Sequence, residues 1–305
     1  MIAAYRTATR RADLPIIAAV VAVTMWGFGP LFVRGISAST PTIVFFRLWL
    51  AVPVMAGVAY LTGGRFSWGV ARTAFVPGVL FASCMVTSFT SFKQTSIANA
   101  TLIASLSPAL ILLVSGPLFG ERHSSRQIGG AVIGIVGVAV VVLGSGATAG
   151  ASLSGDLFAL ANLIGWSVYL LFAKHARSGG VHAGSFIAMV FLWSAILTTP
   201  WALATSHDMG AIGGNDWLLL LAMVVMPGLF GHGLMTWAQA HLDVTVVSLL
   251  MLANPVISSL GAWVVFGQEL RTIQLVGAAI LMVGLAAIVV DQRSTAPVIA
   301  DAEVV

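Results

Sequence analysis

The chain has 305 residues, of which 59% are hydrophobic and 8% are charged, where a typical soluble domain has about a quarter of its residues charged. This composition excludes a soluble globular fold, because too few polar groups are available to cover so much apolar surface. The net charge of +4 comes from basic residues scattered singly between apolar runs, so it does not indicate nucleic-acid binding. Cys84 is the only cysteine, which excludes a disulfide framework and a thiolate metal site.

Apolar runs long enough to cross a bilayer recur along the whole chain. A spanning helix needs about 20 mostly apolar residues, because the hydrocarbon core is about 30 Å thick and each helical residue rises about 1.5 Å. Between Gly-, Pro- and Ser-rich breakers we predict ten such helices, and the fold class is all-α integral membrane. In chain order the predicted spans are Leu14–Val33, Thr42–Leu61, Thr73–Phe92, Ile97–Phe119, Gln127–Gly144, Leu153–Ala173, Ala183–Leu203, Trp217–Ala238, Val244–Phe266 and Thr272–Val290.

Positive charge gathers on one side of the predicted bundle. Cytoplasmic loops of membrane proteins carry an excess of Lys and Arg. The connections Gly144–Leu153 and His207–Asp216 contain neither residue, which is typical of outer loops. With the N-terminus inside, the inner regions hold Arg6, Arg10, Arg11, Arg65, Arg72, Arg122, Arg126, Lys174, Arg177 and Arg293, and the outer regions hold Arg34, Lys93 and Arg271. Both termini are therefore predicted to be cytoplasmic, which requires an even number of spans.

The fourth and fifth predicted helices align with the ninth and tenth without a gap. The aligned positions include Pro108 with Pro255, Phe119-Gly120 with Phe266-Gly267, Gln127 with Gln274, Gly130 with Gly277, and Gly137 with Gly284. Apolar runs share Leu, Val, Ala and Gly by chance, but the Pro, Gln and Phe-Gly matches resist that explanation. We predict a first repeat over 1–146, a second repeat over 147–291 and a disordered cytoplasmic tail over 292–305.

Five spans in each repeat is an odd number, so the second copy should cross the bilayer in the opposite sense to the first. Inverted repeats of this kind are typical of alternating-access transporters, in which a site near the midplane opens to one side and then to the other. The pattern therefore predicts a carrier for a small molecule.

Several local motifs extend this pattern into a family likeness. They are Trp26-Gly27 with Pro30 and Arg34, Phe46-Arg47-Leu48, Ser107-Pro108, Phe119-Gly120-Glu121, Gly129-Gly130 with Gly137, Asn254-Pro255, Phe266-Gly267-Gln268-Glu269 and Gly277. Over nearly the whole chain they resemble the EamA branch of the drug/metabolite transporter superfamily, whose members are ten-helix proteins of two five-helix repeats. The resemblance implies export or exchange of amino acids or related metabolites, including the aromatic amino-acid exporter type. Gln268 before Glu269 departs from the first repeat and argues against strict equivalence of Glu121 and Glu269.

Three single residues are candidates for a substrate site inside the membrane. Arg47 is the one cation well inside a predicted span, so it should face protein or water; it either pairs with a substrate carboxylate or snorkels to the nearby helix end. His232 lies near the middle of the eighth span, where it either binds substrate or protons or is bonded to a neighbouring carbonyl. The ring of Trp26 either lines the cavity or lies at the headgroups.

Polar residues at helical spacing suggest that several spans turn one face toward a central cavity. For any single Ser or Thr, a bond to its own or a neighbouring helix is the simpler reading. The full set of candidates for substrate binding is Trp26, Arg47, Ser83, Thr87, Thr101, Ser105, Trp166, Tyr169, His232, Gln239 and Ser248. As a set they indicate an interior bounded mainly by the third, fourth, eighth and ninth spans.

Prolines and glycines inside the spans predict hinges and close helix contacts. Pro108 and Pro255 interrupt the backbone at corresponding depths of the two repeats, so they are predicted hinges, with tolerated packing kinks as the alternative. Gly130, Gly134 and Gly137, with Gly277 and Gly284, give the fifth and tenth spans smooth faces for close helix contact, within the chain or between copies.

The sequence favours a transporter over other membrane proteins. No motif of a membrane-embedded enzyme is present, so we expect no catalytic residue, no metal site and no cofactor. No ring of charges indicates a channel. The expected partners are a small-molecule substrate and the lipid bilayer of the inner (plasma) membrane, and no nucleic acid. The protein is expected to be a monomer or a homodimer. The weakly charged interior favours a neutral or aromatic amino acid, with a sugar, nucleoside or drug-like amphiphile as the alternative.

Overall fold

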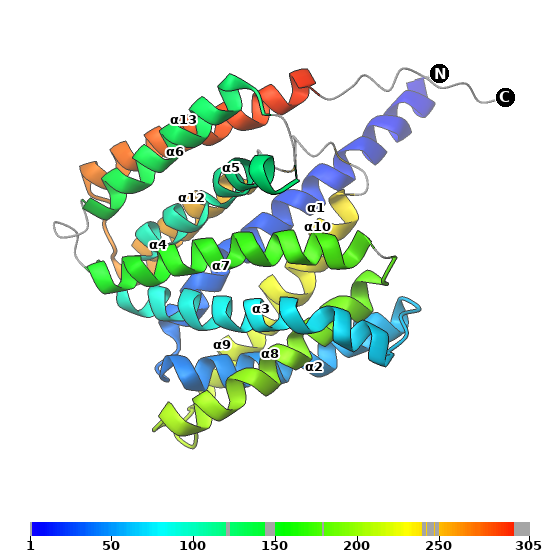
Figure 1. Ribbon diagram of the computed structural model, residues 1–305, viewed down its shortest axis with the longest axis vertical. Helices are drawn as coiled ribbons and strands as arrows, with labels where there is room; N and C mark the ends of the chain where they lie inside the picture. Colours follow the sequence, from blue (N-terminus) through cyan, green and yellow to red (C-terminus); the bar gives the residue numbers. More distant parts are fainter. Residues whose placement is uncertain are drawn as a thin grey trace.

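The computed structural model is a bundle of helices and describes residues 2–119, 123–143, 150–178, 180–239, 242, 247 and 250–295 (Figure 1). In chain order the helices are α1 Ile2–Gly35, α2 Thr40–Leu61, α3 Trp68–Gln94, α4 Ile97–Ala104, α5 Ser107–Phe119, α6 Ser125–Leu143, α7 Leu153–Ser178, α8 Ala183–Thr205, α9 Gly214–Met223, the π-helix η2 Val224–Gly231, α10 His232–Gln239, α12 Ala253–Phe266 and α13 Thr272–Thr295.

The helices have the lengths that a membrane requires. Within the described residues, eight of them are long and apolar enough to cross a bilayer, and two shorter apolar helices, Ala253–Phe266 and Thr272–Ile288, follow. The predicted all-helical membrane fold is therefore confirmed, while ten spans and cytoplasmic termini stay predictions. The first residues of the predicted ninth span, from Val244, lie largely outside the described residues.

Two predicted spans are interrupted. The predicted helix Ile97–Phe119 ends as α4 at Ala104 and restarts as α5 at Ser107, with Pro108 as its second residue. Proline has no N–H to donate and suits the first turn of a helix, where that N–H would be unpaired. A break before Pro108 therefore loses fewer backbone hydrogen bonds than a continuous helix would. The predicted helix Trp217–Ala238 is likewise divided, by the π-helix η2 between α9 and α10.

Helices α6 and α13 pack backbone against backbone. A Cβ added to Gly130 would lie 2.6 Å from the carbonyl oxygen of Gly284, and one added to Gly137 would lie 2.8 Å from that of Gly277. Since Gly130 meets Gly284 while Gly137 meets Gly277, the two helices run antiparallel. The predicted glycine faces therefore pack against each other within one chain.

The matched glutamines Gln127 and Gln274 play the same role at the start of these two helices. The Gln127 side chain accepts a hydrogen bond from the backbone N–H of Ser124 at 3.1 Å, and that of Gln274 accepts one from Arg271 at 3.0 Å. In both cases the side chain reaches back three residues, as in a capping box, and satisfies an N–H that the helix leaves free.

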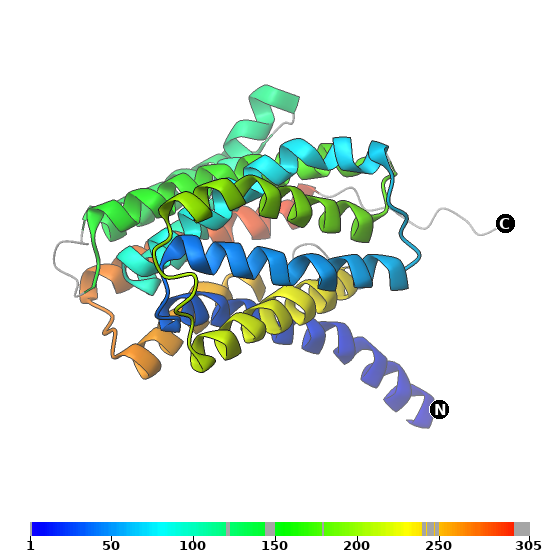
Figure 2. The same ribbon diagram turned by 90° about the horizontal axis from the view of Figure 1, so that it is seen from below.

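Helices from the first half of the chain pack mainly against helices from the second. The principal pairs are α6 with α13, α3 with α7 and α8, α2 with α8, and α1 with α10 and α12. In Figure 1, α6 and α13 form one edge of the bundle and α2 and α8 the other. Figure 2 shows that α13 runs toward the end of the bundle at which α1 begins. The two halves thus form one interleaved body rather than two separate domains.

Candidate functional site

The π-helix η2 brings Trp26 and His232 together. In a π-helix the backbone bonds run from i to i+5, and such segments occur often at functional sites. The indole Nε1 of Trp26, on α1, donates to the carbonyl of Pro227 at 3.1 Å. Its ring lies edge-on to the imidazole of His232, with centroids 5.2 Å apart. The ring of Trp26 therefore packs against the π-helix.

Small residues leave the space that this arrangement needs. A Cβ on Gly231 would lie 2.6 Å from Nε1 of Trp26, so only glycine permits the ring to approach η2 this closely. Gly228 similarly faces Arg47, whose Nη2 would be 3.3 Å from an added Cβ. Both glycines belong to the π-helix, so one irregular segment accommodates side chains from α1 and α2.

Arg47 is buried in the same region. Its side chain is only 6% exposed, and its guanidinium carbon lies 5.6 Å from the centroid of the Phe191 ring on α8. The atoms Nε and Nη1 are buried without a hydrogen-bond partner. The snorkelling alternative is therefore wrong, because the side chain turns into the bundle. Gly228, which faces Arg47, lies in the same π-helix as Gly231, against which Trp26 packs.

An aromatic cluster continues from Arg47 toward α7. The ring of Phe191 lies 4.9 Å from that of Phe81 on α3. Phe81 in turn lies 5.4 Å from Tyr169 and 6.3 Å from Trp166, both on α7. Such separations are typical of favourable aromatic pairs.

We call these seven residues the central belt: Trp26, Arg47, Phe81, Trp166, Tyr169, Phe191 and His232. They come from α1, α2 and α3 of the first half and from α7, α8 and α10 of the second. Trp26, Trp166 and Tyr169 are half-buried and His232 is exposed, so the belt retains surface that a ligand can contact. It combines one buried cation, one imidazole and five aromatic rings, which suits a molecule with an anionic group and an apolar body.

The predicted polar residues do not join this belt. Each of four hydroxyls donates to a carbonyl of its own helix: Ser83 to Leu80, Thr87 to Ser83, Thr101 to Ile97 and Ser105 to Leu102. Their O–H donors are thus used within the helix, which is the simpler reading given above. The side chain of Gln239 and all of Ser248 lie outside the described residues.

The predicted hinges occupy comparable places. Pro108 is the second residue of α5 and exposed, and Pro255 is the third residue of α12 and buried. A hinge function for either proline stays a prediction.

Phe81, Phe191 and the π-helix were not predicted from the sequence. The two phenylalanines carry no signal that separates them from lipid-facing ones. The π-helix has one, since Pro227-Gly228 and Gly231 interrupt an apolar run where they weaken an ordinary helix.

A second polar region caps one end of the bundle. The buried carboxylate of Asp156 accepts from the hydroxyl of Thr95 at 2.6 Å and from the amide of Asn99 at 3.2 Å. Gln274 donates to the Asn99 side-chain oxygen at 2.5 Å. The Asp208 carboxylate accepts from the backbone N–H of Ser39 at 2.6 Å and from its hydroxyl at 2.8 Å.

We call this region the polar cap: Ser39, Thr42, Thr95, Asn99, Asp156, Asp208 and Gln274. Its bonds join first-half residues to second-half residues. The burial of Asp156, which is completely inaccessible, was not predicted, because it lies in the first turn of its helix and no pattern marks its partners.

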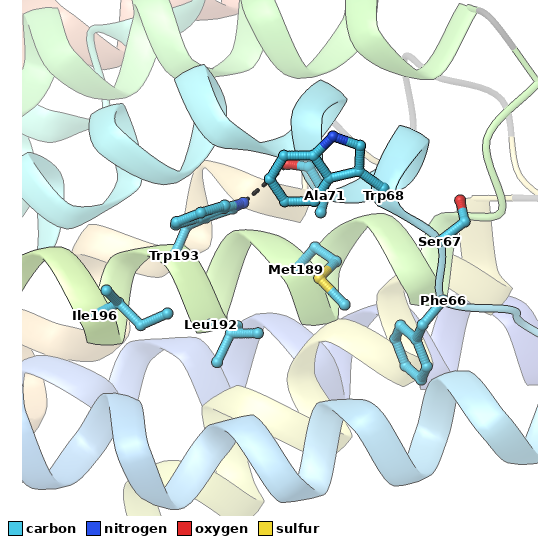
Figure 3. A pocket seen from close by; sticks show the side chains of 8 residues that line it. All are labelled: Phe66, Ser67, Trp68, Ala71, Met189, Leu192, Trp193 and Ile196. Carbon is cyan, nitrogen blue, oxygen red and sulfur yellow. Dashed lines mark hydrogen bonds between the residues drawn. The ribbon is translucent and has the colours of Figure 1, made fainter.

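An apolar groove of about 450 Å³ lies on the flank of the bundle between the start of α3 and α8 (Figure 3). It is lined by Phe66, Ser67, Trp68, Ala71, Met189, Leu192, Trp193 and Ile196. The Trp193 indole N–H is already bonded to the Ala71 carbonyl at 2.8 Å, and the Ser67 hydroxyl accepts from the N–H of Val70. Nothing in this groove would orient a polar metabolite, and the surface suits lipid chains.

Over the described part of the chain, no group of three or more His, Cys, Asp or Glu side chains could hold a metal ion.

Comparison with known proteins gives a consistent result. The model of the EamA-like transporter family matches twice, over residues 13–143 and 153–290. The aromatic amino acid exporter YddG of Ancylobacter novellus is 29% identical over 88% of this chain and 93% of its own length. A probable amino-acid metabolite efflux pump of Salmonella typhimurium is 24% identical over 61% of this chain and 65% of its own length. A solved crystal structure, 24% identical, superimposes with a TM-score of 0.64 over 92% of this chain and 98% of that chain, which supports the fold.

These names are those of transporters and not of enzymes. Together with the apolar helices, they identify a multi-pass protein of the cell's inner membrane.

Proposed function

Because the chain belongs to the EamA-like transporter family, we propose that it exports or exchanges a neutral or aromatic amino acid by alternating access. The observation that carries this proposal is the central belt, in which both halves of the chain contribute to one partly accessible group of aromatic and cationic side chains. The similar proteins named as an aromatic amino acid exporter and an amino-acid efflux pump support the same substrate class.

The alternating-access part of the proposal is supported by the packing of α6 against α13. The glycines that the repeat alignment makes equivalent, Gly130 with Gly277 and Gly137 with Gly284, meet in a reciprocal antiparallel contact. Two equivalent helices can meet in this way when a two-fold axis relates the copies. The family model also matches each half of the chain separately. Both observations favour inverted repeats over 1–146 and 147–291.

The polar cap supports a direction for the cycle. We assign its end of the bundle to the outer face, because the inner connections carry most of the Lys and Arg residues. Since cap bonds such as Asp208 with Ser39 cross between the halves, opening this end requires breaking them. The opposite end holds the first turns of α1, so a substrate for export would enter there.

A sugar, nucleoside or drug-like amphiphile is the alternative cargo. A sugar site needs side-chain donors as well as acceptors, and the O–H donors of Ser83, Thr87, Thr101 and Ser105 are already used within their helices. The aromatic belt fits a flat apolar group better.

Counterflow in proteoliposomes tests the proposal. Vesicles loaded with unlabelled phenylalanine, tyrosine or tryptophan should accumulate the labelled amino acid transiently, whereas a channel would only equilibrate it. His232→Ala should abolish this counterflow and Ser37→Ala, an exposed residue outside the belt, should preserve it. Absence of counterflow for every amino acid in folded, monodisperse protein would refute the proposed cargo, and equal activity of both variants would refute the proposed site.

A further inference from the structure

The guanidinium of Arg47 has more hydrogen-bonding capacity than the protein uses. An arginine side chain carries five N–H donors, one on Nε and two on each Nη. In Arg47 the Nε and Nη1 atoms are buried without partners, which leaves three of those five donors without an acceptor. A positive charge so placed in a membrane protein is costly unless an anion or a polar partner reaches it.

The chain itself offers no such anion. The sequence contains ten Asp and Glu residues, and none falls within the middle of an apolar run. The two best-buried described carboxylates near helix ends are already bonded: Asp156 to Thr95 and Asn99, and Asp216 to the backbone N–H of Ser37 at 2.9 Å. None of the described carboxylates neutralises Arg47, so the guanidinium is available to an anion from outside the chain.

The surroundings of Arg47 restrict what that anion can be. The Phe191 ring lies 5.6 Å from the guanidinium carbon, and Gly228, next to Nη2, presents no side chain to it. A single guanidinium balances a single negative charge, and its planar fork matches the two oxygens of a carboxylate. The aromatic rings that follow, Phe191 and Phe81, provide a contact surface for an apolar group attached to that carboxylate.

The same surroundings hold no described carboxylate that would pair with an ammonium group. Recognition of an ammonium by charge requires a carboxylate, and the described belt contains none. We propose that Arg47 binds the carboxylate of the transported molecule, and that the ammonium group is not read by any charged side chain. The substrate class is then apolar monocarboxylates: aromatic amino acids together with their 2-oxo and N-acyl derivatives. This inference rests on the proposed function, because it takes the central belt as the site.

Binding to the wild-type protein tests the inference without any substitution. The affinities of phenylalanine, phenylpyruvate and N-acetylphenylalanine are compared with those of phenylalaninamide and phenethylamine, by thermal shift and by quenching of tryptophan fluorescence in detergent. The three acids should bind with similar affinity, and the two amines at least about tenfold more weakly, which corresponds to about 1.4 kcal/mol. Equal or tighter binding of the amines overturns the inference. Tighter binding of phenyl phosphate than of the acids also overturns it, since the site would then take a phosphate.

Substitution separates a binding role from a structural one. Arg47→Gln should weaken the acids at least about tenfold while leaving the affinity for phenethylamine unchanged, and Arg47→Lys should restore part of the loss. Arg72→Gln is the matched control, because Arg72 is an exposed cation at the start of α3. If Arg47 only held the fold together, acids and amines would weaken equally, and the inference would fail.

The flux assay keeps the two proposals distinguishable. One result would be that amines and acids inhibit phenylalanine counterflow equally. That result would support a carrier but overturn the inference that Arg47 selects for a carboxylate. Selective binding of acids without any counterflow would support that inference and refute transport of these compounds.

Discussion

Gly130 of α6 and Gly284 of α13 approach so closely that a Cβ added to either would lie within 2.6 Å of the other's carbonyl oxygen. Their backbones are thus in direct contact, and no side chain separates the helices. Close contact of small residues is a main source of helix association in membranes, where apolar side chains gain nothing by leaving lipid.

Adding a methyl group to this contact should destabilise the protein. Gly130→Ala forces the two helices apart, and overpacking of this kind costs about 1–3 kcal/mol. Gly129→Ala is the matched control, because nothing lies within 4 Å of a Cβ at that neighbouring position. Thermal unfolding followed by size-exclusion chromatography should show a lower Tm for Gly130→Ala only. Equal Tm values for the two variants would contradict the packing.

Replacing the buried carboxylate of Asp156 with the amide of asparagine should destabilise the protein. Asp156→Asn places an NH₂ group against the Asn99 amide whichever way the side chain is turned, because that amide now donates to both carboxylate oxygens. Leaving buried donors without acceptors costs about 1–3 kcal/mol. The Tm in detergent measures the loss, and Glu269→Gln, at an exposed position, should leave Tm unchanged. A stable Asp156→Asn protein would show that the network adds little.

The stability that Asp208 contributes to the polar cap should depend on pH only under acidic conditions. Burial raises the pKa of this carboxyl, but hydrogen bonds from Thr42, Ser39 and Ser206 outweigh it and lower the pKa from 3.8 to about 2. A carboxyl with a lowered folded-state pKa contributes stability above its unfolded pKa and loses it as the pH falls through the folded value. The Tm difference between wild type and Asp208→Asn should therefore be constant from pH 7 to about pH 4, and shrink between about pH 4 and pH 2. A difference that changes between pH 5 and pH 7 would mean that another group controls the cap.

Because Trp26 approaches the π-helix closely, substitution of Gly231 should impair transport and substitution of the nearby Gly233 should not. Gly231→Ala would place a methyl group 2.6 Å from Nε1 of Trp26, and so displace the ring from the Pro227 carbonyl and from His232. Counterflow should fall at least about tenfold, since one good contact is worth about 1.4 kcal/mol. Gly233→Ala meets nothing within 4 Å and should keep wild-type flux. Comparable flux in both variants would remove Trp26 from the site.

Much of the helical architecture follows from the sequence, because the length of an apolar run is fixed by the bilayer. The predicted span Thr42–Leu61 became α2 at Thr40–Leu61, and Ala183–Leu203 became α8 at Ala183–Thr205. The breaks in the fourth and eighth spans did not follow from it. Whether Pro108 or Pro227 bends, ends or widens a helix depends on which neighbours satisfy the backbone carbonyls of the irregular segment, as Trp26 does for the carbonyl of Pro227.

The site was predicted where chemistry makes a residue rare in a membrane. Arg47 and His232 stood out for this reason, and Trp26 for the glycines and proline around it; the structure brings the three into one region. Ser83 and Thr87 were equally polar, yet a hydroxyl can be satisfied by its own helix, and sequence alone does not distinguish that from a wet surface. Phe81 and Phe191 were missed because a phenylalanine in an apolar run looks the same whether it faces lipid or a neighbouring ring.

The backbone contact between α6 and α13 also has a mechanical consequence. If the two halves move against each other as alternating access requires, this contact would oppose sliding and leave rotation about a pivot through the glycines. Displacement then grows with distance from the pivot, and in Figure 1 α2 and α8 form the opposite edge of the bundle. Arg47 and Phe191 lie on those two helices, away from the pivot. Under that rotation the separation of these two side chains would change more than that of residues beside the glycines.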